Sequence, residues 1–103
     1  MKQDVYNFFS NELGLGPDDI GPLYESFVDS FGEVARDLRQ ASPTDETELR
    51  RITHAIIGFS QNVGALDLFD AAKALNAAAK AGDAPACEAG AARILALYDE
   101  YSK

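Results

Sequence analysis

The sequence predicts an all-α fold: an antiparallel up-down four-helix bundle with a short additional helix at the N-terminus. Apolar residues recur at spacings of three and four along five segments, which is the pattern of helices that bury one face. No segment shows the sustained alternation of apolar and polar residues that a half-buried strand needs. The last four segments are joined by short connections, which favour antiparallel neighbours.

The first two helices are expected at residues 4–13 and 22–40. The sequence "GLGP" follows the first of these segments, and "GP" at 21–22 marks the start of the second. Because the first helix is short, we expect it to pack on the side or end of the bundle. The expected buried residues of these two helices are Val5, Phe8, Phe9, Leu13, Leu23, Phe27, Phe31, Val34 and Leu38.

The other three helices are expected at residues 45–63, 66–81 and 84–101. The turn "VGA" separates the first from the second. Gly82 can end its helix in a left-handed conformation, and Asp83 can cap the helix that follows. The interior of the bundle should contain Ile56, Phe59, Leu68, Leu75, Ile94 and Tyr98.

Length and charge limit the possible functions. The 103 residues suit a single domain, residues 1–103, with one modest core. Nine basic and seventeen acidic residues give a net charge of -8, which disfavours binding to nucleic acid or to anionic membranes. No apolar run is long enough to span a membrane, and no secretory signal is visible. With Cys87 as the single cysteine, these features predict a cytoplasmic protein.

The single histidine, His54, lies on the outer face of its predicted helix. With Ile56 at the centre of the buried face and about 100° per residue, His54 falls about 160° away, almost opposite the core. An ordinary solvated histidine is one interpretation of this position. The residues that share this outer face are Arg50, Arg51, Ile57, Gly58 and Gln61.

Gly58 suggests a second interpretation, because glycine inside a helix costs about 1 kcal/mol relative to alanine. Without a side chain one turn after His54, another protein surface can approach the imidazole closely. The alternative is a helix that simply tolerates the glycine. Ile57 lies about 100° from the core centre, between core and solvent, and fits the edge of a docking patch.

The run "LRRITHAIIGFSQNVGALDLFDAAKALNAAAKAGD" resembles the histidine-containing phosphotransfer (HPt) domain of multistep phosphorelays. That family has a histidine, a glycine four residues on, a small or hydroxyl residue about six on, and Gly-Ala at ten and eleven. The stretch "IGPLYESFVDSFGEVARDLRQA" is similar to the preceding helix of the family, so the resemblance covers roughly residues 20–100. The matching residues here are His54, Gly58, Ser60, Gly64 and Ala65.

One position departs from the family pattern. The family usually carries a lysine three residues after the histidine, where it helps to hold the phosphoryl group, and this chain has Ile57. Arg50 and Arg51 lie one turn before His54 and face the same way, so they can supply positive charge.

The next helix offers further polar candidates. Counting back from the turn at 64–65 places residue 75 level with His54. Asn76 lies at that level, and Lys80 lies about one turn beyond it. Family members often place polar residues at such offsets, bordering the phosphorylation site. The other interpretation of Lys80, and of Lys73 on the opposite side, is ordinary solvated charge.

The resemblance implies that His54 accepts a phosphoryl group from an aspartate of a receiver domain and passes it to another receiver. An imidazole is nucleophilic in its neutral form, which suits this chemistry. The implied partners are response-regulator receiver domains and a hybrid sensor histidine kinase, with Mg²⁺ on the receiver and no cofactor or metal in this chain. No phosphate loop or kinase signature is present, so phosphorylation from ATP is not expected. We expect a monomer.

Two alternatives remain open from the sequence. The chain could be a docking module that binds a receiver but transfers phosphate poorly, because Ile57 replaces the usual lysine. It could also be a helical interaction protein outside phosphorelays, which the spacing of Gly58 and Gly64 disfavours.

Overall fold

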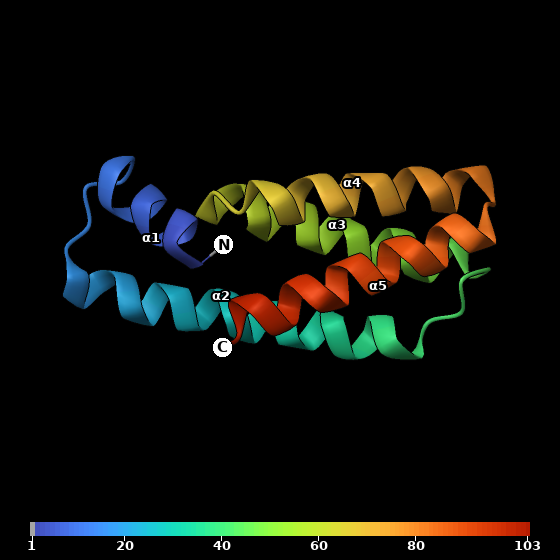
Figure 1. Cartoon of the computed structure of the whole chain (residues 1–103), viewed down its shortest axis with the longest axis horizontal. Coiled ribbons are helices and arrows are strands. Elements are labelled where there is room, and N and C mark those ends of the chain that lie inside the picture. The colour runs from blue at the N-terminus through green and yellow to red at the C-terminus, as the bar shows by residue number, and fades with distance from the viewer. Residues whose placement is uncertain (1) are drawn as a thin grey trace.

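A computed structural model describes residues 2–103 as five helices, with no strand among them (Figure 1). The predicted all-α fold is confirmed for this part of the chain. The molecule is elongated, with extents of 43 × 20 × 18 Å. The helices are α1 (Lys2–Asn11), α2 (Pro17–Gln40), α3 (Glu46–Val63), α4 (Leu66–Ala81) and α5 (Ala84–Tyr101).

Four longer helices, α2 to α5, form the body of the molecule, and consecutive ones run in opposite directions along its long axis (Figure 1). α2 packs on α3 and α5, and α4 packs on the same two helices. The short α1 covers one end, where it packs on α2 and α3. Within residues 2–103 no helix is long and apolar enough to cross a membrane.

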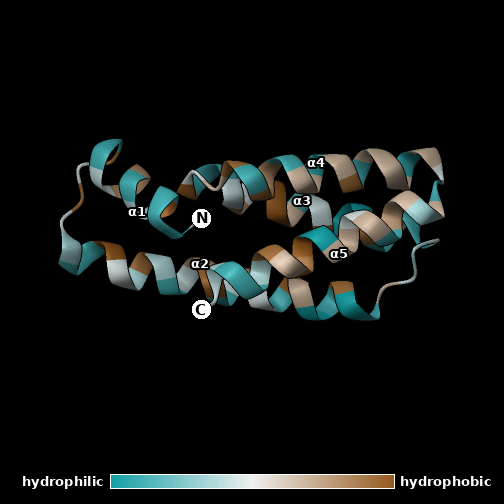
Figure 2. Ribbon diagram, viewed as in Figure 1, coloured by the Kyte–Doolittle hydropathy of each residue, from teal (hydrophilic) through white to brown (hydrophobic). Residues whose placement is uncertain are grey.

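The apolar faces of the helices meet in one core, and the brown segments of Figure 2 lie mainly between helices. Aromatic rings fill its centre: the ring centroids of Phe27 and Tyr101 lie 5.4 Å apart, in edge-to-face contact. Burial of each large apolar side chain stabilises the fold by about 1.5–3 kcal/mol. Of the six residues predicted to fill the interior of the bundle, four are fully buried: Ile56, Leu68, Leu75 and Ile94.

Phe59 and Tyr98 were also predicted inside, but both are only half-buried. Each packs its ring on Phe31 from the rim of the core, with centroids 6.0 Å and 5.1 Å away respectively. A large ring at the edge of two packed helices keeps one side in solvent, which explains the difference.

Three predicted boundaries were wrong at the N-terminal end: α1 begins at Lys2 rather than residue 4, and the end of α1 and the start of α2 also differ. α2 begins at Pro17 rather than Pro22, because Ile20 is buried and anchors an extra turn against the core. Proline suits the first helical position, which Pro17 occupies. Pro22 lies inside the helix, where it removes one backbone hydrogen bond, but the helix continues through it. Leu23, which was expected to be buried, is 43% exposed, because the buried face runs through its neighbour Tyr24.

α1 ends at Asn11, two residues before its predicted end. Gly14 adopts a left-handed conformation with φ of 67°, and the backbone amide of Leu15 then donates to the carbonyl of Phe9 at 3.0 Å. This turn leaves Leu13, which was expected in the core, 52% exposed, while Leu15 packs partly against the core.

The predicted caps at the α4–α5 connection are present. Gly82 has φ of 67°, and the side chain of Asp83 accepts a hydrogen bond from the amide of Ala86 at 3.1 Å. α3 is delimited in the same way, by the carboxylate of Asp45 at its start and by Gly64 at its end, with φ of 71°. Both ends of α3 are therefore defined by local chemistry.

Two buried tyrosines connect the end of α5 to the rest of the molecule. The hydroxyl of Tyr24 donates to the backbone carbonyl of Tyr101, and the hydroxyl of Tyr101 donates to the carboxylate of Asp67 at the start of α4. Burial, and then nearby Tyr6, raise the pKa of Tyr24 to about 12. Burial and the contact with Asp67 also raise the pKa of Tyr101.

Candidate functional site

His54 lies in the middle of α3 and is exposed, as its position on the helix predicted. Neither of its ring nitrogens has a hydrogen-bond partner among residues 2–103, so the imidazole is free to react. It borders an open hollow of about 300 Å³ on the surface of α3. The residues that share this hollow with it are Glu46, Thr47, Arg50 and Arg51.

The two arginines beside His54 are held differently. The guanidinium of Arg51 bridges to α2, where its Nη2 lies 2.8 Å from the carboxylate of Asp37, and it also binds Glu48. These bonds, chiefly the one to Glu48, raise the pKa of Arg51.

Arg50 makes fewer polar contacts than Arg51. Its Nη1 pairs with Glu46 at 3.3 Å, and its Nε is buried without a hydrogen-bond partner in the described part of the chain. Because Arg50 has a donor to spare and one exposed ion pair, it is the arginine that is freer to turn toward an anion at His54.

A buried hydroxyl connects α3 to the candidate residue on α4. Thr53, directly before His54, is completely buried, and its hydroxyl donates to the backbone carbonyl of Arg50 at 3.0 Å and to Oδ1 of Asn76 at 3.2 Å. Asn76 therefore lies level with the turn that carries His54, as counting from the turn predicted. Because the amide oxygen of Asn76 is engaged, its two N–H groups are available for another acceptor.

The two lysines of α4 have different surroundings. The ammonium group of Lys73 lies over the ring of Phe69, 5.1 Å from its centroid. Lys80 is exposed, one turn after Asn76, and makes no ion pair with any residue in 2–103. Lys80 can thus add mobile positive charge near Asn76, whereas Lys73 is occupied by the aromatic ring.

The two glycines of the motif occupy unlike environments. A Cβ atom added to Gly58 would meet nothing within 4 Å, so the fold itself does not require glycine there. Gly64 has a left-handed backbone, and its Cβ would lie 2.6 Å from the ring of Phe8 on α1. The fold thus explains Gly64, and the open space at Gly58 supports a clearance role toward a partner.

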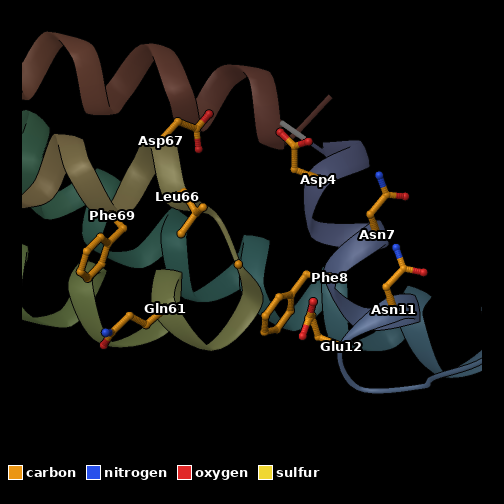
Figure 3. Close-up of a pocket in the computed structure, with 10 residues that line it drawn as sticks. Asp4, Asn7, Phe8, Asn11, Glu12, Gln61, Leu66, Asp67 and Phe69 are labelled. Atoms are coloured by element: carbon orange, nitrogen blue, oxygen red, sulfur yellow. The ribbon is translucent and has the colours of Figure 1, made fainter.

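The remaining candidates lie on either side of Gly58. Ile57 is half-buried and packs against the core, so that only part of its side chain reaches the surface. Gln61 is exposed and lines a larger hollow of about 690 Å³ between α1 and the α3–α4 connection (Figure 3). The sequence does not predict this hollow, because periodicity within single helices does not show where α1 folds back.

Most of the chain matches one known protein family. The family model described as Hpt domain matches residues 22–103, which is more than half of the chain. The chain belongs to the Hpt family. No curated protein and no solved structure matches it. Hpt domains act in phosphotransfer within phosphorelays and interact with receiver domains of two-component systems.

Family membership gives the geometry of this Hpt domain a chemical meaning. The imidazole of His54 faces solvent on a helix that is capped at both ends, so a partner can approach it. Donors that could meet the phosphoryl oxygens come from two helices, Arg50 from α3 and Asn76 and Lys80 from α4. α1 lies before residue 22 and is therefore outside the part that the family model matches.

Proposed function

We propose that this Hpt domain accepts a phosphoryl group on His54 from an aspartate of one receiver domain and passes it to the receiver domain of another response regulator. The observation that carries this proposal is the exposed imidazole of His54, which has no partner among residues 2–103 and has empty space beside it at Gly58. Membership of the Hpt family, which acts in phosphotransfer, supports the assignment of this side chain as the phosphoryl acceptor.

The transfer step balances without any further reactant. The lone pair of an unprotonated ring nitrogen of His54 attacks the phosphorus of the aspartyl phosphate. A P–N bond forms, the P–O bond to the aspartate breaks, and the carboxylate leaves with the electron pair. The second receiver reverses these events with its own aspartate. The receiver supplies the aspartate and Mg²⁺, so the Hpt domain contributes alignment and positive charge.

We assign roles to the surrounding residues on the basis of their contacts. Arg50, Lys80 and the amide N–H groups of Asn76 would balance the charge on the phosphoryl oxygens. Arg51, which is held by Asp37, would contribute to the docking surface rather than to the reacting oxygens.

The docking surface around the histidine would include three more residues. Gly58 provides clearance, and Ile57 and Gln61 provide contacts on either side of it. The proposal includes a monomer in which residues 1–103 act as one domain in the cytoplasm, and a hybrid sensor histidine kinase as the source of phosphate.

Ile57 favours a second candidate function. A half-buried isoleucine stands where the family usually has a lysine, so one expected cation is missing from the reacting face. The alternative is a module that docks on a receiver but transfers phosphate poorly or not at all.

A labelling experiment separates the two functions. Receiver domains of the same genome, charged with acetyl phosphate and Mg²⁺, are mixed with the protein, and intact mass spectrometry follows the products. A carrier gains one phosphoryl group that is labile in acid and stable in base, as expected of phosphohistidine. His54→Gln should abolish this species with an unfolding free energy within about 0.5 kcal/mol of wild type, because the side chain is exposed. Receivers that bind but never label His54 would overturn the carrier function and leave the docking module.

A further inference from the structure

A hollow of about 690 Å³ lies between α1 and the α3–α4 connection. Figure 3 shows Phe8 of α1 on one side, Phe69 of α4 on the other, and Leu66 between them. Both rings are half-buried, whereas Leu66, the first residue of α4, is 68% exposed. We call the surface lined by Phe8, Gln61, Gly64, Leu66 and Phe69 the α1 groove.

The α1 groove gathers apolar surface that the fold leaves in water. One exposed leucine is ordinary on a protein surface. Here Leu66 adjoins two aromatic side chains around one depression, and contiguous apolar patches of this kind mark sites of protein association. Leu66 is also more exposed than the other large exposed apolar residues in the described chain, Leu13 and Leu23.

The rim of the groove is acidic. Glu12 lies beside Phe8, Asp67 and Asp4 lie on the side of the groove toward α5, and none of the described residues that line it is basic. The whole chain carries a net charge of -8. An apolar patch with a negative rim complements an apolar side chain that is flanked by lysine or arginine, because opposite charges speed encounter and exclude acidic partners.

The α1 groove is continuous with the face that carries His54. Gln61 lines the groove and lies seven residues after His54, on the same exposed face of α3. Seven residues correspond to about 10 Å along a helix. A partner domain that presents its aspartate to His54 therefore reaches the groove with the same surface.

We propose that the α1 groove docks the receiver domain that exchanges phosphate with His54, and that this receiver inserts an apolar side chain flanked by lysine or arginine. The proposal rests on the proposed function of His54. α1 lies before the residues that match the Hpt family model, so this side of the groove lies outside the matched part of the chain. α1 would thus help to select the receiver.

Two variants test the apolar centre and the acidic rim separately. Leu66→Ser removes the exposed apolar side chain, and Glu12→Lys reverses one rim charge. The substrate is the phosphorylated receiver that labels the wild type best, and initial rates are measured against its concentration. We expect each variant to raise KM about tenfold with little change in kcat, since a tenfold effect corresponds to about 1.4 kcal/mol of binding. For Glu12→Lys the effect should shrink as salt is raised.

Matched controls lie outside the groove. Leu23→Ser removes another exposed leucine, on α2, and Glu88→Lys makes the same charge change near the start of α5, at the opposite end of the bundle (Figure 1). Both controls should keep the KM of wild type. Phosphoramidate, a small donor that bypasses the receiver, reports whether the imidazole of each variant still reacts, and circular dichroism reports whether each variant is folded.

The outcomes separate the groove from the function of His54. A KM unchanged by Leu66→Ser overturns the docking proposal while the carrier function stands. If receivers bind without labelling His54, the carrier function fails, and the dissociation constant of the receiver is measured in place of KM. Weaker receiver binding by Leu66→Ser would then still support docking at the α1 groove. A concentration-dependent dimer of the wild type that Leu66→Ser abolishes in sedimentation would assign the groove to a second copy of the chain and overturn the proposal. Absence of binding to any receiver overturns both.

Discussion

The hydroxyl of Thr53 donates a hydrogen bond across the α3–α4 interface to Oδ1 of Asn76, at 3.2 Å. Thr53 is completely buried and is the direct neighbour of His54 in the chain. The bond therefore positions an amide of α4 relative to the turn of α3 that presents the imidazole. The amide nitrogen of Asn76 is not used by this bond, and under the proposed function it would donate to a phosphoryl oxygen.

Thr53→Val should slow the reaction of His54 by about three- to tenfold, because the amide of Asn76 loses its fixed orientation, a loss of about 1 kcal/mol. Phosphoramidate labelling is the appropriate measurement, since it does not depend on docking. Thr53→Ser keeps the hydroxyl and should recover most of the rate. If valine and serine slow the reaction equally, the effect is one of packing and Asn76 is not positioned by this bond.

The two motif glycines should respond oppositely to alanine. Gly58→Ala should raise the free energy of unfolding by about 1 kcal/mol, because the helix gains propensity and the added Cβ meets nothing. Gly64→Ala should lower it by more than about 1–2 kcal/mol, because a left-handed backbone is strained in alanine and the Cβ would press on Phe8. Denaturant unfolding of both variants measures this.

A bulky residue at position 58 tests clearance directly. Gly58→Leu should fold normally, because the space at this position is open, but it should weaken receiver binding by obstructing the approach to His54. Binding equal to that of wild type would show that Gly58 faces no partner.

A cation introduced beside the imidazole should accelerate transfer. Ile57→Lys adds an ammonium group close to the phosphoryl oxygens, whose developing charge it would offset. The half-buried Ile57 also packs on the core, so we expect stability to fall by about 1 kcal/mol. A double-mutant cycle with Arg50→Gln measures whether the arginine already supplies this charge. If Arg50 already supplies this charge, Ile57→Lys should increase the transfer rate more in the Arg50→Gln background than in wild type. Strictly additive effects of the two substitutions would show that Arg50 does not supply it.

Alkaline pH should destabilise the fold through Tyr24, whose pKa burial raises to about 12. Between about pH 10 and 12 the unfolded tyrosine loses its proton while the folded one keeps it, so the free energy of unfolding falls as the pH rises. Tyr101, whose pKa is also raised, acts in the same direction. Tyr24→Phe should lower stability at pH 7 and flatten this alkaline decline. Parallel declines in wild type and variant would show that Tyr24 does not contribute to it.

The parts of the fold that local chemistry determines were predictable. His54 faces outward because Ile56 faces the core, and this follows from the helical period. The end of α4 follows from Gly82 and Asp83, whose capping geometry is local. Counting residues on both sides of the short α3–α4 connection also predicted that Asn76 lies beside the helical turn that carries His54.

What depended on contacts between distant segments was not predictable. The salt bridge from Arg51 to Asp37 arises from the packing of α3 on α2. Helical periodicity places Arg50 and Arg51 on the same outer face, so it could not predict which of the two forms this bridge. Leu23 looked buried because it fits a spacing of four with Phe27, although Ile20 and Tyr24 define the buried face. The α1 groove exists because α1 folds back over the turn at Gly64.

The missing side chain at Gly58 also affects the motion of the helix. Glycine leaves the backbone less constrained, and here no neighbouring side chain covers it within 4 Å. Water can therefore reach the backbone of the turn between His54 and Gly58, and its amide hydrogens should exchange with solvent faster than those of the central turns on either side of it. A receiver seated over this turn would slow that exchange. Docking could thus be followed on the unmodified protein, through the protection of a few backbone amides, before any phosphate moves.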